Sequence, residues 1–155
     1  MSRCLASLVF GWGNPGRGDD ALGPALIGRL DALAPAHPEW GEVRLLTDFQ
    51  LQPEHALDLE GCERVLFVDA GASCPAPFAL ERLASSREFG YTTHAMSPAA
   101  LLALFRQVCG CEPPPAWLLG IHAASFELGA PLSETASRNL EAAVAFAGEW
   151  LSARH

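Results

Sequence analysis

The residues Leu5-Ala6-Ser7-Leu8-Val9-Phe10 and the run Gly11-Trp12-Gly13-Asn14-Pro15-Gly16-Arg17-Gly18-Asp19-Asp20 decide the fold of this chain. The first six are almost continuously apolar, as in a parallel strand that is covered on both faces. The glycines that follow allow the backbone to approach a ligand closely. From Asp20 to Leu33, apolar residues recur at helical spacing. The sequence therefore predicts a strand, a glycine-rich loop and a helix.

The rest of the chain continues this alternation. Ser97-Pro98 and Ser133 are typical helix starts, a serine cap in both cases and a proline at the first helical position in one. We expect further strands at Val43 to Asp48, Arg64 to Asp69, Pro77 to Leu83 (an edge strand) and Trp117 to Ile121, and helices at Pro53 to Leu59, Ala99 to Val108 and after Ser133. Alternating strands and helices predict a doubly wound α/β fold. We interpret residues 1–155 as a single-domain three-layer α/β/α sandwich with a mostly parallel twisted sheet of about five strands.

Composition and charge exclude several classes of protein. The 155 residues are 50% hydrophobic and 18% charged, which is typical of a globular domain. The net charge is −8, and the basic residues are scattered arginines, so we expect no nucleic-acid partner. No apolar run approaches 18 residues, which predicts no membrane span. The odd number of cysteines and the absence of a signal-peptide pattern favour a cytoplasmic protein.

The glycine run matches G-x-G-x-x-G, which suggests a dinucleotide-binding loop. The match is incomplete, because Pro15 and Gly18 delay the helix until the two acids, which would repel a phosphate. No acidic residue ends a second strand about 20 residues later, as the contact with a ribose requires. The chain contains no lysine, which excludes a Walker A motif. A nucleotide or small-molecule binding module stays open as an alternative.

Three acidic side chains stand where strands end. Aspartate is favoured at a helix N-terminus, so we expect Asp19 to cap the first helix and Asp20 to be free. Asp69 ends the clearest strand and precedes Ala70-Gly71. Ligands of open α/β sheets bind beyond the carboxyl ends of the strands. We therefore expect Asp20 and Asp69 to share one edge of the sheet.

Of the five histidines, His94 is the best candidate for binding a ligand, because it lies in a polar loop just before Ser97-Pro98. The other four are interpreted as a loop residue (His37), part of a short exposed-looking helix (His55), a packed strand end (His122) and the terminus (His155). The sequence has no H-E-x-x-H pair, no Cys-x-x-Cys knuckle and no G-x-S-x-G elbow. Serine and cysteine nucleophiles therefore have no support in the sequence.

Three motifs, in this order along the chain, resemble those of the hydrogenase maturation endopeptidases, which trim the C-terminal extension of the large subunit of nickel–iron hydrogenases. They are Gly11-x-Gly13-Asn14 with Asp19-Asp20 and Gly23, then Val68-Asp69-Ala70-Gly71, then His94 with Ser97-Pro98 and a leucine-rich helix. Gly129-Ala130-Pro131-Leu132-Ser133 before the last helix also fits, so the resemblance spans nearly the whole chain. In relatives the first acid is often glutamate, and the form of the first loop looks like the branch that serves cytoplasmic, NAD-linked hydrogenases.

The resemblance implies that Asp20, Asp69 and His94 contact a metal and carry the catalysis. Two carboxylates and an imidazole suit a borderline divalent ion such as nickel or zinc. The implied nickel arrives inside the large-subunit precursor, so we expect an endopeptidase of the metal-dependent or aspartic type, monomeric, with no tightly bound metal at rest. Whether nickel activates water, polarises the carbonyl or only positions the peptide stays open, as does a carboxylate general base. A non-catalytic chaperone for the same precursor is a further alternative.

Overall fold

The computed structural model describes residues 6–84 and 96–153. Its strands are β1 (Ala6–Trp12), β2 (Val43–Asp48), β3 (Cys62–Gly71), β4 (Phe78–Leu83) and β5 (Ala116–His122). Its α-helices are α1 (Leu22–Leu33), α2 (Pro98–Cys109) and α3 (Glu134–Ser152). Short 3₁₀ helices are η1 (Gly18–Ala21), η2 (Ala34–Ala36), η3 (Pro38–Trp40) and η4 (Pro53–Leu59). Every element expected from the sequence in the described ranges is therefore present, with ends shifted by a few residues.

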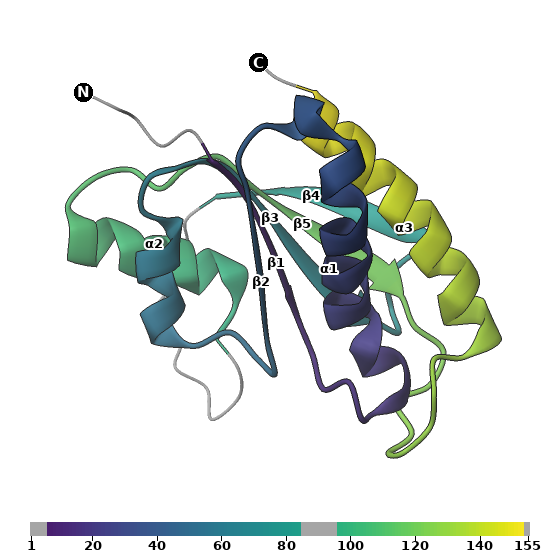
Figure 1. Cartoon of the computed structure of the whole chain (residues 1–155). Coiled ribbons are helices and arrows are strands. Elements are labelled where there is room, and N and C mark those ends of the chain that lie inside the picture. The colour runs from purple at the N-terminus through teal and green to yellow at the C-terminus, as the bar shows by residue number, and fades with distance from the viewer. Residues whose placement is uncertain (1–5, 85–95, 154–155) are drawn as a thin grey trace.

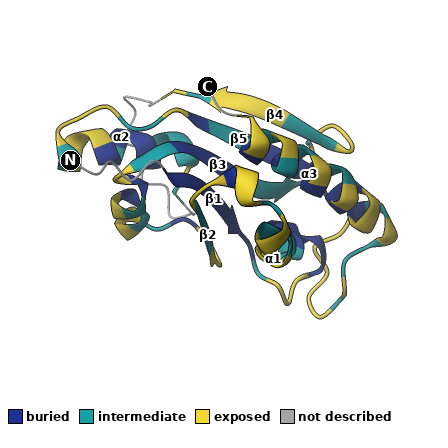
Figure 2. Cartoon of the chain, turned by 45° about the horizontal axis from the view of Figure 1, so that its top comes forward, coloured by how far each residue is buried: buried dark blue, intermediate teal, exposed yellow. Residues whose placement is uncertain are grey.

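The five strands form one sheet in the order β2-β1-β3-β5-β4. The first four strands in this order are parallel, and β4 pairs antiparallel with β5 at the edge. Half of the residues of β4 are exposed and none is fully buried, whereas β1 is buried along its whole length (Figure 2). The expected mostly parallel sheet and its edge strand are confirmed.

Helices cover both faces of the sheet and complete the three layers (Figure 1). On one face, α1 and α3 pack on Val9, Leu66 and Leu119; on the other, η4 and α2 pack on Phe10 and Phe67. Successive residues of a strand point to opposite faces, so a central strand that is covered on both sides must be apolar throughout. This is the physical reason why the apolar runs predicted the central strands.

The order of the strands reverses beside β1. The chain leaves β1 through α1 to reach β2, and it returns through η4 on the opposite face to reach β3. β1 therefore lies between β2 and β3, and the connections to these two strands lie on opposite faces of the sheet. Such a switch point is where open α/β sheets bind their ligands. Asp20 follows β1 and Asp69 lies near the end of β3, so both acids flank it.

The starts of α2 and α3 agree with the sequence prediction, and the start of the first helix differs from it. Ser97 and Ser133 cap α2 and α3, because their Oγ atoms accept hydrogen bonds from the amides of Ala100 and Ala136, both at 3.1 Å. The first helix, by contrast, is preceded by the 3₁₀ turn η1, and α1 begins only at Leu22. Within the two described ranges, no helix is both long and apolar enough to cross a membrane.

Candidate functional site

Asp69 is a partly buried carboxyl group at the carboxyl end of β3. Its Oδ1 accepts a hydrogen bond from the amide of Ala70 at 2.8 Å. Burial raises the pKa of Asp69 to about 6; the Ala70 hydrogen bond lowers it, and repulsion from the Asp20 carboxylate raises it. The two acids thus interact electrostatically, as their expected place at one edge of the sheet requires. A carboxyl group with a pKa near neutrality can act as a general base or acid.

The Asp20 carboxylate is held by the loop after β1. Its Oδ2 accepts a hydrogen bond from the amide of Asn14 at 2.7 Å, and Asn14 Oδ1 in turn accepts one from Gly16 at 2.8 Å. The residues at the N-cap positions of η1 and α1 are Arg17 and Ala21, and neither caps through its side chain. As predicted, Asp20 does not cap a helix. Its carboxylate is not free, however, because it accepts the hydrogen bond from the Asn14 amide of its own loop.

Asp19 is structural, as expected, but its predicted partner is wrong. It is fully buried, and its carboxylate accepts hydrogen bonds from residues at the other end of the chain rather than from its own helix. The donors are the amides of Ala124, Ser125 and Ser133 and the hydroxyl of Ser133, at 2.7 to 3.1 Å. Burial acts to raise the pKa of Asp19, but these hydrogen bonds outweigh it and lower the pKa below the ordinary value. No local pattern could reveal a partner more than 100 residues away.

The glycines of the first loop allow the loop to pack against itself. Gly13 has φ of 145°, and a Cβ atom on it would lie 1.9 Å from the carbonyl oxygen of Asp20. On β1, a Cβ on Gly11 would lie 2.5 Å from the carbonyl oxygen of Gly23 in α1. Only glycine permits both approaches. Because the helix begins after the G-x-G-x-x-G run, its N-terminal amides are not presented within the motif, as a dinucleotide site would need.

His94 lies outside the described residues, and so does His155. His122 is a packed residue, as expected: its Nδ1 donates to the carbonyl of Cys74 at 2.7 Å. His55 lies in the expected short helix, several residues of which are exposed, but its own side chain is only 12% exposed and packs edge-on against Phe10. Both ring nitrogens of His55 are engaged, since Nδ1 accepts from the Gln52 amide and Nε2 donates to Asp48.

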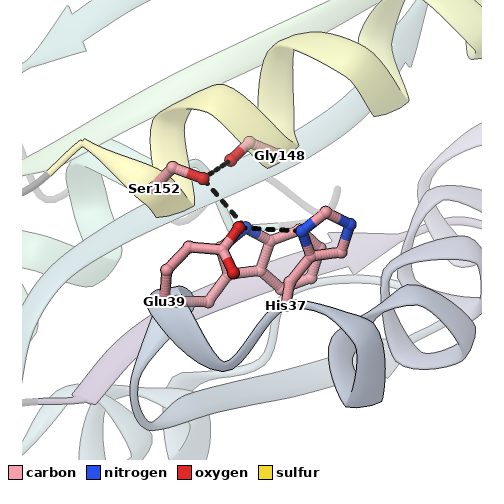
Figure 3. A network of polar contacts seen from close by, with 5 residues as sticks. His37, Glu39, Gly148 and Ser152 are labelled. Atoms are coloured by element: carbon pink, nitrogen blue, oxygen red, sulfur yellow. Dashed lines mark hydrogen bonds and ion pairs between the residues drawn. The ribbon is translucent and has the colours of Figure 1, made fainter.

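His37 belongs to a polar network that links the segment around η3 to α3 (Figure 3). Its ring stacks on Trp40 and donates a hydrogen bond from Nδ1 to Glu39 at 2.8 Å. Trp40 donates to the hydroxyl of Ser152, which donates to the carbonyl of Gly148. A groove of about 550 Å³ lies beside this network. It is lined by residues from the end of α1, from the segment around η3 and from the C-terminal half of α3, such as Leu33, Trp40 and Gly148.

Cys74 is a neighbour of Asp69 that the sequence did not indicate. A Cβ on Gly71 or Gly120 would lie within 2.7 Å of its Sγ, so the two glycines make room for the thiol. Gly120 is the register partner of Asp69, and burial and repulsion from Asp69 raise the pKa of the Cys74 thiol. Even so, no three His, Cys, Asp or Glu side chains of residues 6–84 and 96–153 are grouped to hold a metal ion. The described part of the site supplies two carboxylates.

The fold is that of the proteases that mature nickel–iron hydrogenases. A crystal structure of the [NiFe] hydrogenase maturation protease HycI from Thermococcus kodakarensis KOD1 is similar with a TM-score of 0.73 and 22% identity over 96% of this chain and 93% of that one. The hydrogenase maturating endopeptidase HybD from E. coli gives 0.69 and 23% over 92% and 90%. A hydrogenase 2 maturation peptidase from Thaumarchaeota archaeon SCGC_AB-539-E09 gives 0.65 and 24% over 94% and 97%. No protein-family model matches the chain, and no curated protein matches its sequence.

Proposed function

We propose that this protein is an endopeptidase that removes the C-terminal extension from the nickel-loaded large-subunit precursor of a nickel–iron hydrogenase. The observation that carries the proposal is the pairing of Asp20 and Asp69 at the switch point of this fold. Proteins of the same fold with solved structures include hydrogenase maturation proteases. Their names and the two carboxylates together support a metal-dependent or aspartic-type hydrolase.

In this proposal Asp20, Asp69 and His94 bind the nickel that the precursor already carries. His94 is assigned by the sequence resemblance. Nickel is thus part of the substrate, and the enzyme holds no tightly bound metal at rest. The docked metal places the C-terminal peptide beside Asp69, whose ionised carboxylate takes a proton from the water that attacks the scissile carbonyl. The C–N bond then breaks, and the protonated Asp69 carboxyl group gives its proton to the leaving amine.

The finer details of the proposal concern the substrate and the location of the enzyme. We assign the precursor to a cytoplasmic NAD-linked hydrogenase, because of the form of the loop from Pro15 to Gly18. The enzyme acts as a monomer in the cytoplasm, where the precursor is made. Parallel assays with precursors of different hydrogenase types would test this assignment, since the NAD-linked precursor should be cleaved fastest.

The decisive experiment measures the intact mass of the precursor after incubation with the enzyme, with and without inserted nickel. Loss of the C-terminal peptide only from the nickel-loaded form is the expected result. Equal cleavage of the metal-free precursor would refute nickel docking. Binding of the precursor with no change in its mass would indicate a chaperone instead.

Variants at the site complete the test. Asp20→Ala, Asp69→Ala and His94→Ala should each lose cleavage by a factor of about 100 or more, as expected when a metal contact or general base is removed. Asp31→Ala is the matched control, because Asp31 is an exposed aspartate of α1 and lies outside the site. Normal cleavage by all three site variants would refute the assignment of the residues.

A further inference from the structure

The carboxylate of Asp19, the residue before Asp20, is buried and accepts four hydrogen bonds. It is 0% exposed. Oδ1 accepts from the Ser133 amide, and Oδ2 accepts from the Ser133 hydroxyl and from the amides of Ala124 and Ser125. A buried charge is stable only when it is compensated by such donors. The carboxylate therefore fixes the start of α3 and the loop after β5 relative to residue 19.

Backbone hydrogen bonds join the same two segments on either side of Asp19. They are Asp19 N to Ser125 O at 2.8 Å, Gly18 N to Ala130 O at 3.1 Å and Gly129 N to Gly16 O at 2.8 Å. The loop after β1 and the loop after β5 consequently run side by side at the bottom of Figure 1. These contacts make the two loops one hydrogen-bonded unit, with the Asp19 carboxylate at its centre.

Asp20 is the next residue in this unit. Its backbone lies against Gly13, and its carboxylate accepts from the Asn14 amide at 2.7 Å. Both contacts depend on the short turn η1 holding its place, and η1 has no side-chain cap of its own. The tertiary hydrogen bonds of Asp19 supply that constraint. Groups behind a site commonly orient the residues that contact the ligand in this way.

We infer that Asp19 is a positioning residue: its buried carboxylate locks η1 against the loop after β5 and thereby fixes the Asp20 carboxylate relative to Asp69. Its effect on cleavage rests on the proposed function, whereas its effect on Asp20 does not. The hydrogen bond from the Asn14 amide to Asp20 reports the position of Asp20 directly. The test can therefore be read without a substrate.

The experiment compares wild type with Asp19→Asn and Ser133→Ala by NMR hydrogen exchange. Asparagine has one oxygen where the carboxylate has two, and its amide donors would face the donors of the loop. Ser133→Ala removes one of the four hydrogen bonds and the cap of α3, but it leaves the charge and the three amide donors of Asp19 in place. It is the matched control for loss of stability alone. We expect exchange of the Asn14 amide to be at least tenfold faster in Asp19→Asn and close to wild type in Ser133→Ala, after correction for global unfolding.

Unchanged exchange at Asn14 in Asp19→Asn, or an equal acceleration in Ser133→Ala, would overturn the inference. If Asp19→Asn does not fold, hydrogen exchange in the wild-type protein tests the inference instead. The Asn14 and Ser125 amides should then exchange at related rates, because they open together as one unit. Unrelated exchange rates would refute the inference. Cleavage of the precursor adds a second readout. We expect Asp19→Asn to have a kcat at least tenfold below that of wild type and a KM within twofold of it. Ser133→Ala should cleave the precursor at the wild-type rate. If the wild-type protein does not cleave the precursor, the proposed function is wrong. The exchange data still test whether Asp19 positions Asp20.

Discussion

Replacement of Asp69 by asparagine should stabilise the protein at pH 8 while it abolishes cleavage. Burial and the Asp20 carboxylate raise the pKa of Asp69 from 3.8 to about 6, so the folded protein opposes ionisation of this group. Well below pH 3.8 Asp69 is neutral in both the folded and the unfolded protein, so it does not change the free energy of unfolding. Between pH 3.8 and about 6 the unfolded chain ionises while the folded Asp69 stays largely protonated, so the stability falls over this range and stays lower above it.

The magnitude follows from the size of this shift. A difference of about two pKa units corresponds to about 3 kcal/mol above pH 6. Because Asp69 is only partly buried, solvent screening reduces this figure, and we expect a gain of about 1 to 3 kcal/mol for Asp69→Asn at pH 8. The asparagine oxygen can still accept the Ala70 hydrogen bond, so the substitution removes the charge without removing that contact.

Urea unfolding of wild type and Asp69→Asn at pH 8 and pH 4 measures the effect. The gain should be present at pH 8 and nearly absent at pH 4, and Asp31→Asn, an exposed control on α1, should show no such gain. A gain of the same size at both pH values would mean that the charge is not its cause. A loss of stability at pH 8 would refute the premise that burial of the ionised Asp69 carboxylate destabilises the folded protein.

Three further predictions follow from the same edge of the sheet. Gly13→Ala should destabilise the protein by more than about 2 kcal/mol in urea unfolding, because its Cβ would meet the Asp20 carbonyl oxygen at 1.9 Å at a φ of 145°. Gly28→Ala, in open space on α1, should instead stabilise by about 0.5 to 1 kcal/mol, so destabilisation by both would contradict the reasoning. The kcat/KM for the nickel-loaded precursor should rise with pH through about 6 as Asp69 ionises; a flat profile would exclude Asp69 as the base. In Asp20→Asn, carbon-13 NMR titration of Asp69 should give a pKa below that of wild type, because the repulsion is gone, and an unchanged pKa would show that burial alone sets it.

The sequence by itself determined the elements of this protein and the ends of several of them. Apolar runs such as Leu5 to Phe10 predicted the central strands, because a strand between two helical layers has no polar face. Ser97 and Ser133 predicted where α2 and α3 begin, because a cap acts within three residues of itself. The same local patterns placed Asp20 after the loop that follows β1 and Asp69 near the end of β3.

Only the tertiary structure decided what these residues contact. The expected cap Asp19 binds Ser133 and its neighbours across more than 100 residues, and His55 is enclosed by Phe10 and Asp48. The raised pKa of Asp69 depends on its burial and on the approach of Asp20, which exist only after β1 and β3 pair. Propensity and capping act between near neighbours in sequence, so the sequence reveals them. Burial and long-range hydrogen bonds depend on which segments meet, and the fold alone determines that.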